Sequence, residues 1–441
     1  MVLPMTNPEV GLMSLAGILV LISVGLWVPF ALMLVSYLGV WAIKGSPVLA
    51  GKLLALTAAD SLSNYFFSVV PLFVLMGYIV AASGMGRDAF DTAQHLFRRW
   101  RGGLGVATVG ANALFSAVTG ISIAAAAVFA HIAVPEMVRR GYTVRFSVGV
   151  VAGSSVLGML IPPSLLLILY GLLTEQSIAD MFIAGIIPGL LLALVFTIGV
   201  VVMAIWFPTF TGYGAANYQD ESADETTAVH LKRLVPLCTL VVIVFGGIYS
   251  GLFTPTEAGA VGCFVSLLLG LIRKRLSWRD LNAVLANTGL VTASVCFLVL
   301  SAQTYSRMLS LSGLPMDAGN FLAANGHGYW FTLLAYVSVI ILMGAILDSA
   351  SIMLIMVPLM LPIVVGLEVD LIWFGIVTVI AIEIGLLTPP FGMAVFVIKS
   401  TLNDPSISLT DVFLGAAPFA VLMFIVLLMI MVMPWLATGL L

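Results

Sequence analysis

Apolar runs of about twenty residues recur along almost the whole chain, each long enough to cross a hydrocarbon core of about 30 Å. Of the 441 residues, 61% are hydrophobic and 8% are charged, which is about a third of the charged fraction of a soluble globular domain. A water-soluble fold is therefore excluded in practice, and the net charge of -3 gives no sign of a nucleic-acid partner. We expect an all-α, multi-pass integral membrane protein whose main surroundings are the lipid bilayer.

Ten of the apolar runs read as single membrane spans. We expect these spans near residues 11–27, 29–44, 62–83, 144–171, 177–207, 232–250, 254–272, 282–309, 371–398 and 409–437.

The apolar stretch 104–138 does not read as a single span, because arginines flank both of its ends, at 98–101 and at 139–145. Basic flanks are typical of the cytoplasmic side, so both ends are expected there. Each half of the stretch would be about 25 Å long as a helix, too short to cross and return. We therefore predict a re-entrant hairpin whose turn is the polar segment Ser116–Ser122.

A second stretch, 329–366, has no Lys or Arg close to either end and carries Asp348, Ser349 and Ser351 at its middle. We predict a second hairpin that enters from the opposite side of the membrane.

The basic residues also orient the chain. With the basic loops inside, only Lys44, Lys52 and Arg307 of the 17 Lys and Arg residues lie outside. This asymmetry predicts that both termini lie on the non-cytoplasmic side, which is the periplasm for the bacterial inner membrane that we expect.

The two halves of the sequence match at a constant offset of 227 in the numbering. The matched positions are Ser122 with Ser349, Pro135 with Pro362, and Gly158-x-Leu-x-Pro162-Pro163 with Gly385-x-Leu-x-Pro389-Pro390. Five spans separate each element from its counterpart, and an odd number turns the second copy upside down. Such inverted repeats are typical of secondary transporters. We predict a first inverted repeat at 1–207, a cytoplasmic linker at 208–231 and a second inverted repeat at 232–441.

Each predicted hairpin is followed by a span that a proline pair interrupts, at 144–171 and at 371–398. Proline removes a hydrogen-bond donor and blocks the helical bond behind it. Because lipid cannot satisfy the freed carbonyl groups, such a break persists where protein, water or an ion replaces the lost partner. Each hairpin tip and its broken span are thus predicted to form one oxygen-lined site for a small hard cation, and helix N-termini between the two sites would favour an anion.

These considerations give three sets of candidate residues. The predicted cation ligands are Ser116, Thr119, Gly120, Ser122, Ser154, Ser155, Gly158, Ile161, Asp348, Ser349, Gly385, Thr388 and Gly392. The predicted substrate-binding residues are Ser122, Ser155, Asp348, Ser351 and Thr388. The predicted helix-breaking residues are Pro162, Pro163, Pro389 and Pro390.

Structural roles compete with these functional ones. Proline kinks often only shape packing, but their duplication beside two polar hairpins favours a site. A carboxylate at mid-membrane costs about 2.5 to 3.5 kcal/mol on insertion scales, which favours a functional Asp348. Glu383 either lies buried against a hydroxyl or borders an aqueous cavity. Glu257 follows Thr254 at a helix start, where an acid is an ordinary dipole partner.

At these residues the chain resembles the large membrane subunit of TRAP transporters, the tripartite ATP-independent periplasmic systems. The resemblance covers nearly the whole length. The residues on which the resemblance rests are Gly158–Ser164, Thr254–Ala258, Leu347-Asp348 with Pro358 and Pro362, and Glu383–Gly392. The hairpin tips depart from the usual family pattern, with Thr119-Gly120-Ile121-Ser122 and with Ser349-Ala350 after Asp348.

The resemblance implies an ion-transporter-superfamily-like fold that works as an elevator and imports carboxylate-bearing solutes, such as sialic acids or C4-dicarboxylates, with two or more Na⁺ ions. It also implies two partners, a small four-span membrane subunit and a periplasmic solute-binding protein. An alternative is a single-component sodium/dicarboxylate or citrate-type symporter. The sequence has no phosphate-binding Gly-Lys-Thr/Ser loop and no paired zinc-ligand spacing, so neither a nucleotide, a transition metal nor an enzymatic activity is expected.

Overall fold

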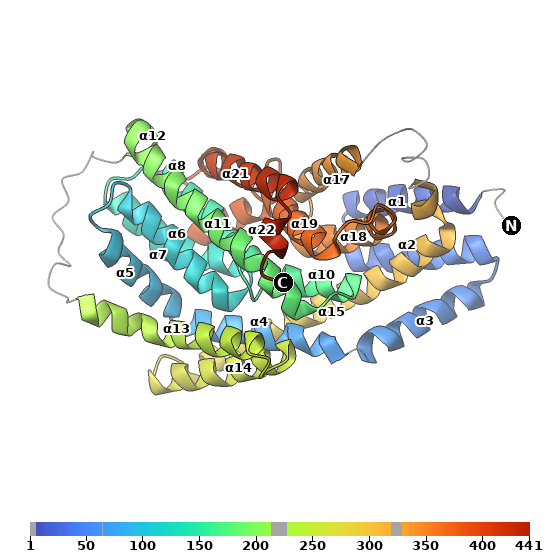
Figure 1. The fold of residues 1–441 in the computed structure, drawn as a ribbon, viewed down its shortest axis with the longest axis horizontal. Coiled ribbons are helices and arrows are strands. Elements are labelled where there is room, and N and C mark those ends of the chain that lie inside the picture. Colours follow the sequence, from blue (N-terminus) through green and yellow to red (C-terminus); the bar gives the residue numbers. More distant parts are fainter. Residues whose placement is uncertain (1–5, 64, 213–226, 319–328) are drawn as a thin grey trace.

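The structure is a computed structural model that describes residues 6–63, 65–212, 227–318 and 329–441. Figure 1 shows the described chain as a bundle of helices, most of which run along its longest axis. The expected linker 208–231 lies mostly outside the described residues.

Helices in the first part of the chain have the following bounds: α1 Asn7–Ser23, α2 Val28–Lys44, α3 Pro47–Ser63, the 3₁₀ turn η1 Tyr65–Ser68, α4 Val69–Ala82, α5 Met85–Phe97, α6 Gly103–Thr119, α7 Ser122–Arg139, α8 Val144–Ser155, α9 Leu157–Leu160, α10 Leu165–Thr174, α11 Ile178–Trp206 and α12 Pro208–Thr211. Those in the second part are α13 Thr227–Tyr249, α14 Pro255–Ile272, α15 Trp278–Ser312, α17 Tyr329–Gly344, α18 Ser349–Gly366, α19 Leu371–Gly385, α20 Met393–Leu402, α21 Leu409–Val432 and α22 Trp435–Thr438.

Four composite elements position the site and are named as follows. Hairpin 1 is α6 with α7, and hairpin 2 is α17 with α18. Broken helix 1 is α8, α9 and α10, and broken helix 2 is α19 and α20.

Helix bounds recur at the same offset that relates the two halves of the sequence. The first residues of α7 and α18 are separated by this offset, and so are their last residues. The same holds for the short helices α12 and α22. These matching bounds agree with the predicted repeat. The repeat itself, the upside-down orientation of the second copy and the division of the chain at 207 and 232 stay predictions.

Local sequence signals explain where the broken helices start. Thr143 accepts a hydrogen bond from the amide of Phe146 at the start of α8, and Ser164 accepts one from the amide of Leu167 at the start of α10. Side-chain oxygens at this position satisfy amides that have no partner inside the helix. α10 therefore begins as a newly capped helix rather than as a continuation of α9.

The core of the molecule lies around the two broken helices. Every residue of α8 from Phe146 to Ser155 is buried, as is every residue of α19 from Trp373 to Gly385. The duplicated elements also pack across the two halves, with α7 against α20, α10 against α18 and α8 against α21. Such continuous burial explains why most residues of both segments are apolar on every side of the helix. The polar side chains that they do carry, among them Ser154, Thr378 and Glu383, are buried.

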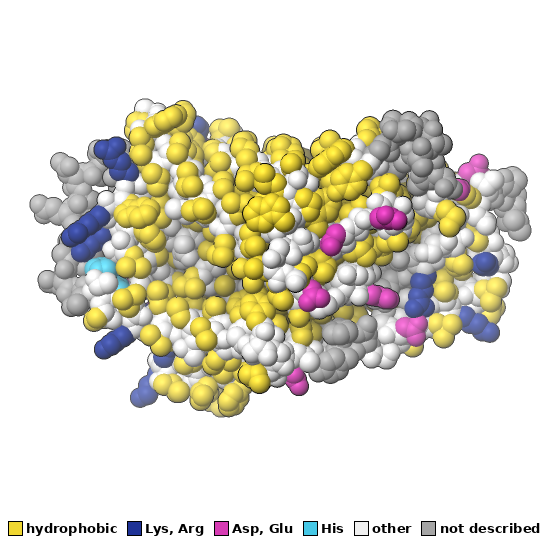
Figure 2. All heavy atoms as spheres, in the orientation of Figure 1, with side chains coloured by type: hydrophobic (Ala, Val, Ile, Leu, Met, Phe, Trp, Pro, Cys, Tyr) yellow, Lys and Arg dark blue, Asp and Glu magenta, His cyan; other side chains and the backbone are white. Residues whose placement is uncertain are grey.

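The outer surface is that of a membrane protein. Figure 2 shows hydrophobic side chains over most of the face in view, with Lys and Arg side chains toward its left and right ends. Among the described residues, eight helices are long and apolar enough to cross a bilayer, or nine when the bent pair α4 and α5 is counted as one span.

The first third of the chain differs from the prediction in one helix. α3 (Pro47–Ser63) was not expected, and the span predicted at 62–83 corresponds to α4 alone. Lys52 and Asp60 interrupt the apolar pattern of α3 and so hid it. α3 nevertheless packs against α2 and α15, and Arg307 of α15 forms an ion pair with Asp60 at 2.8 Å.

The segment Arg87–Arg101 contains most of α5. α5 bends 61° away from α4. Its Asp88 is buried and pairs with Arg273 at 2.7 Å and Arg275 at 2.9 Å, both of which follow α14. These ion pairs hold α5 against the end of α14.

Candidate functional site

The tip of hairpin 1 docks on the proline pair of broken helix 1. α6 ends at Thr119, and Gly120 takes a left-handed conformation with φ +64°. The carbonyl oxygen of Gly120 accepts a hydrogen bond of 3.1 Å from the amide of Leu165, the first residue of α10. A Cβ atom on Gly120 would lie 2.2 Å from the carbonyl oxygen of Pro163, so only glycine fits here.

The turn of hairpin 1 also rests on Gly158, as a Cβ atom on Gly158 would lie 3.0 Å from the backbone nitrogen of Ser122. The sequence placed Gly120, Ser122 and Gly158 in one site, and the structure brings them together.

Hairpin 2 docks on broken helix 2 in a similar way. The carbonyl oxygen of Ala345, at the end of α17, accepts hydrogen bonds from the amides of Phe391 at 2.9 Å and Gly392 at 3.4 Å. Gly385 packs against Gly344, where a Cβ on Gly385 would lie 2.5 Å from the Cα of Gly344. Gly385 is the counterpart of Gly158 in the duplicated sequence, so a glycine contact supports both docked hairpins.

Glu383 joins the two hairpin tips. Its side chain lies on α19 and is fully buried. Oε2 accepts a hydrogen bond of 3.0 Å from the hydroxyl of Ser122, and Oε1 accepts one of 3.3 Å from the hydroxyl of Ser349. Of the two alternatives that the sequence left open for Glu383, burial against a hydroxyl is confirmed. The two serines are counterparts in the duplicated sequence, and each is the first residue of the returning helix of its hairpin.

Two buried oxygens without hydrogen-bond partners lie on α6. Asn112 donates a 2.7 Å hydrogen bond through Nδ2 to the hydroxyl of Ser154 on α8. Its Oδ1 atom and the hydroxyl of Ser116 have no hydrogen-bond partner within the described chain. Buried oxygens without partners are costly, and residues four apart share a helix face. The two oxygens are therefore suited to bind a cation that accepts their lone pairs.

The remaining predicted cation ligands of the first half are buried, and the hydroxyl groups of Thr119, Ser154 and Ser155 donate within their own helices. Thr119 donates to the carbonyl of Phe115 at 3.2 Å, and Ser155 donates to that of Ala152 at 2.8 Å. Ser154 donates to the carbonyl of Val150 at 2.7 Å while it accepts from Asn112. Ile161 is the extended residue that ends α9. Each of these hydroxyl oxygens retains lone-pair capacity for a cation.

Asp348 caps helix α18 at its N-terminus. Oδ2 accepts a 3.1 Å hydrogen bond from the amide of Ser351, and Oδ1 accepts one from the hydroxyl of Ser351. Asp348 and Ser351 both line a cavity of about 370 Å³ between hairpin 2, α15 and the connection of α1 to α2, which includes Trp27. The structure thus gives Asp348 a capping role, and its predicted part in cation and substrate binding stays a prediction.

Among the predicted cation ligands of the second half, Thr388 bonds within the break of broken helix 2. Its hydroxyl at 2.8 Å and its amide at 3.0 Å both donate to the carbonyl of Gly385. Gly392, with φ +48°, precedes α20. The predicted substrate-binding residues do not converge on one cavity in this conformation. Asp348 and Ser351 line the cavity of about 370 Å³ described above. Ser122 contacts Glu383, whereas Ser155 and Thr388 donate to carbonyls of their own segments.

Both proline pairs interrupt the helices in which they lie. The Pro162-Pro163 and Pro389-Pro390 peptide bonds are cis. Regular helix stops at Leu160 before the first pair and at Gly385 before the second.

Sequence reasoning did not include Glu383 or Asn112 in the site. For Glu383 a signal was present, because an ionisable residue within a membrane span is functional by default. For Asn112 the signal was weaker, namely an amide one helical turn before Ser116 on a helix of otherwise small and apolar residues.

Two docked hairpins, two interrupted helices and a shared buried carboxylate within an apolar helical bundle define the class of this molecule, a multi-pass membrane transport protein. The solved structure of the Alcanivorax borkumensis YdaH transporter has the same fold, with a TM-score of 0.61 over 88% of this chain and 89% of that chain, at 14% sequence identity.

The chain belongs to the family described as "Tripartite ATP-independent periplasmic transporter, DctM component", whose model matches residues 15–436. It is therefore a large permease subunit of a TRAP transporter and a multi-pass protein of the inner membrane, as the sequence predicted.

Three relatives illustrate the range of solutes in this family. The C4-dicarboxylate TRAP transporter large permease protein DctM of Pseudomonas aeruginosa is 32% identical, with 86% of this chain and 87% of that protein covered. The sialic acid TRAP transporter large permease protein SiaM of Vibrio cholerae is 31% identical, with 85% of each covered. The 2,3-diketo-L-gulonate TRAP transporter large permease protein YiaN of Escherichia coli is 29% identical, with 87% of this chain and 88% of that protein covered.

Proposed function

We propose that the chain imports a small organic acid together with two or more Na⁺ ions. The observation that carries this proposal is the docking of each hairpin tip on its own broken helix, through the Leu165 amide on Gly120 and the Phe391 amide on Ala345. Each junction gathers backbone carbonyl and hydroxyl oxygens. The junction of hairpin 1 is buried, whereas Pro389, Pro390 and Phe391 at the junction of hairpin 2 are exposed. Such hard oxygen ligands suit a small cation like Na⁺, which replaces the hydrogen-bond partners lost at a break.

Within hairpin 1, the first Na⁺ would bind near the unpartnered Oδ1 of Asn112 and the hydroxyl of Ser116. The second would bind at the break of broken helix 2, where Thr388 and Gly385 lie. An acidic substrate would then bind between the hairpins, since the bound cations and the N-termini of α7 and α18 favour negative charge.

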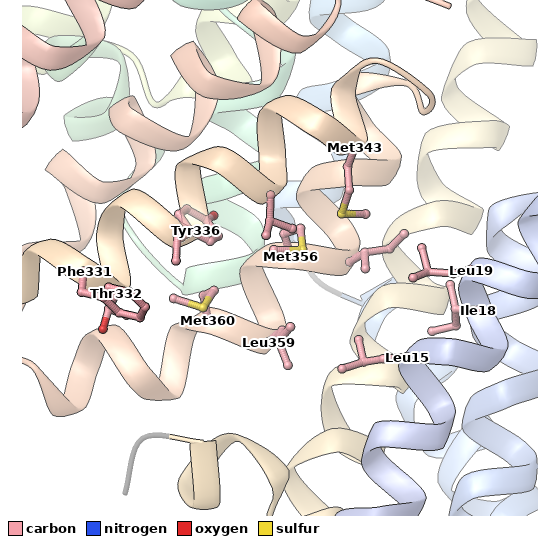
Figure 3. Close-up of a pocket in the computed structure, with 13 residues that line it drawn as sticks. Leu15, Ile18, Leu19, Phe331, Thr332, Tyr336, Met343, Met356, Leu359 and Met360 are labelled. Carbon is pink, nitrogen blue, oxygen red and sulfur yellow. The ribbon is translucent and has the colours of Figure 1, made fainter. Parts of the chain in front are cut away.

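Movement as an elevator is supported by the boundary between α1 and hairpin 2. A cavity of about 360 Å³ separates them (Figure 3). Three methionines of hairpin 2, Met343, Met356 and Met360, line it opposite Leu15 and Leu19 of α1. Methionine is flexible and fills irregular gaps, so this boundary is suited to sliding. In the proposed mechanism, the hairpins and broken helices cross the membrane as one body past α1, α2 and α15.

The partners follow from the family, in which the large permease works with a small membrane subunit and a periplasmic binding protein. We propose that this chain pairs with a separate four-span subunit and receives its substrate from a periplasmic solute-binding protein. The substrate belongs to the small organic acids that the names of the relatives record, namely a C4-dicarboxylate, a sialic acid or a related sugar acid.

Uptake in proteoliposomes that contain the chain and its small subunit tests this proposal. We expect accumulation of the acid only with an inward Na⁺ gradient and only when the binding protein is present outside. Sodium-dependent uptake without the binding protein would favour the single-component symporter instead. Uptake that persists after collapse of the Na⁺ gradient would overturn the coupling.

A further inference from the structure

Glu383 has a place that the duplication of the chain does not explain. Its counterpart in the first half, at the offset that pairs Ser122 with Ser349, is Val156, so the first half has no equivalent acid. Yet the two serines that donate to Glu383, Ser122 and Ser349, are themselves counterparts in the two halves. One carboxylate thus serves the tips of both hairpins, with one oxygen for each.

Burial makes these two hydrogen bonds important for the side chain. Glu383 is fully buried. Among the residues that the structure describes, the hydroxyls of Ser122 and Ser349 are the donors that reach its carboxylate, and no Lys or Arg forms an ion pair with it. A buried carboxylate oxygen that loses its donor bears the desolvation penalty of an unsatisfied acceptor. If one hairpin tip moves away from Glu383, the contact between Glu383 and the other tip is therefore weakened as well.

The position of the serines relates this penalty to the proposed cation sites. Each serine is the first residue after the turn of its hairpin. Ser122 lies two residues after the docked Gly120, and Ser349 directly follows the cap residue Asp348. A shift of either tip that changes its cation site must therefore also change its hydrogen bond to Glu383.

We propose that Glu383 is a positioning residue that clamps the two hairpin tips together, so that the cation sites at both tips fill and empty cooperatively. This inference rests on the proposed sodium-coupled function. A merely structural core residue would stabilise the fold but would not transmit a change from one hairpin to the other.

Backbone hydrogen exchange, measured on the full-length protein in lipid nanodiscs during a sodium titration, tests the clamp. The two observed segments are 117–124 and 344–352, one for each tip. We expect sodium to protect both segments of the unchanged protein with one common midpoint. Ser349→Ala removes a hydroxyl from hairpin 2 only, and it should raise the midpoint for the tip of hairpin 1 about fivefold, the effect of one net hydrogen bond.

Two further variants sharpen the experiment. Glu383→Ala should separate the two midpoints, whereas Glu383→Gln, which keeps polar atoms for both serines, should leave them together. Ser266→Ala is the matched control, since the hydroxyl of Ser266 is buried and donates at 2.9 Å to Cys263 in the same helix. Should Glu383→Ala fail to accumulate, Ser349→Ala decides alone.

The clamp is overturned if Ser349→Ala and Glu383→Ala change only the tip of hairpin 2 and leave that of hairpin 1 as in Ser266→Ala. If sodium protects neither tip of the unchanged protein, sodium coupling fails while the clamp remains testable. Without sodium, Glu383→Ala must then speed exchange about fivefold at both tips, and an effect at one tip or at none refutes the clamp.

Discussion

The backbone amide of Leu165 donates a 3.1 Å hydrogen bond to the carbonyl oxygen of Gly120. This bond joins the turn of hairpin 1 to the first residue of α10, directly after the proline pair of broken helix 1. The relationship requires a residue at 120 that tolerates φ +64° and leaves no atom in front of Pro163. Hairpin 1 is consequently docked through backbone atoms, and a side chain at position 120 would prevent docking.

Gly120→Ala is expected to reduce uptake by about tenfold or more, because the new Cβ meets the Pro163 carbonyl and the left-handed conformation costs roughly 1–2 kcal/mol. Initial uptake rate, normalised to protein in the membrane, is the measurement. Gly289→Ala is the matched control, since a Cβ there meets nothing within 4 Å. Equal uptake by the two variants would contradict the docking role.

Asn112→Ala is expected to raise the sodium concentration for half-maximal uptake roughly tenfold, since a ligand oxygen for a charged partner is lost. The maximal rate should change much less. Ser116→Ala should act in the same direction, because both unpartnered oxygens lie on α6. Thr108→Ala, which removes a buried hydroxyl bonded to Leu104 in the same helix, is the control. A sodium curve unchanged in both Asn112→Ala and Ser116→Ala removes this part of the proposed site.

Asp348→Asn separates the capping role of Asp348 from its charge. Asparagine caps helices about as well as aspartate, so the protein level and the melting temperature should stay close to those of the unchanged protein. Sodium-dependent uptake should nevertheless fall severalfold if the carboxylate takes part in cation binding, as a charged ligand contributes more than a neutral one. Full activity of Asp348→Asn would reduce Asp348 to a helix cap.

Pro162→Ala and Pro389→Ala, combined in one protein, should reduce sodium-dependent transport more strongly than they reduce the amount of protein in the membrane. Alanine restores an amide donor and permits helical hydrogen bonds through the break, which withdraws carbonyl oxygens from a cation. Pro188→Ala, at a proline inside the continuous helix α11, is the control for loss of a proline in general. Comparable effects of the double variant and the control on uptake would argue against a special role for the breaks.

Much of the architecture could be predicted from local sequence. The hairpin predicted at 329–366 begins with α17 at Tyr329 and ends with α18 at Gly366. Glu257 is the acid of a capping box with Thr254, as its place at a helix start suggested. These features depend on short-range rules of chain length, proline geometry and capping, which the sequence shows directly.

Other features depend on tertiary packing and were missed for that reason. The serines that contact Glu383 lie 261 and 34 residues away from it, so no local pattern pairs them. α3 was missed because Lys52 and Asp60 lower its apolar character, while its contacts with α2 and α15 stabilise it. The sites at the hairpin tips were predicted as hydroxyl-bearing residues and glycines together with Ile161 and Asp348, but Glu383, the acid at their junction, was not among them.

Val156 occupies the position in the first half of the chain that corresponds to Glu383 in the second half. The two halves of the sequence match at an offset of 227, but only the later half supplies the acid to which Ser122 and Ser349 both donate. During synthesis, hairpin 1 is complete long before Glu383 has left the ribosome. Ser122 can form its hydrogen bond to Glu383 only after more than half of the chain has followed. Neither half alone contains all three residues of this contact. A gene split between the halves would yield one fragment that carries the carboxylate and another that lacks it.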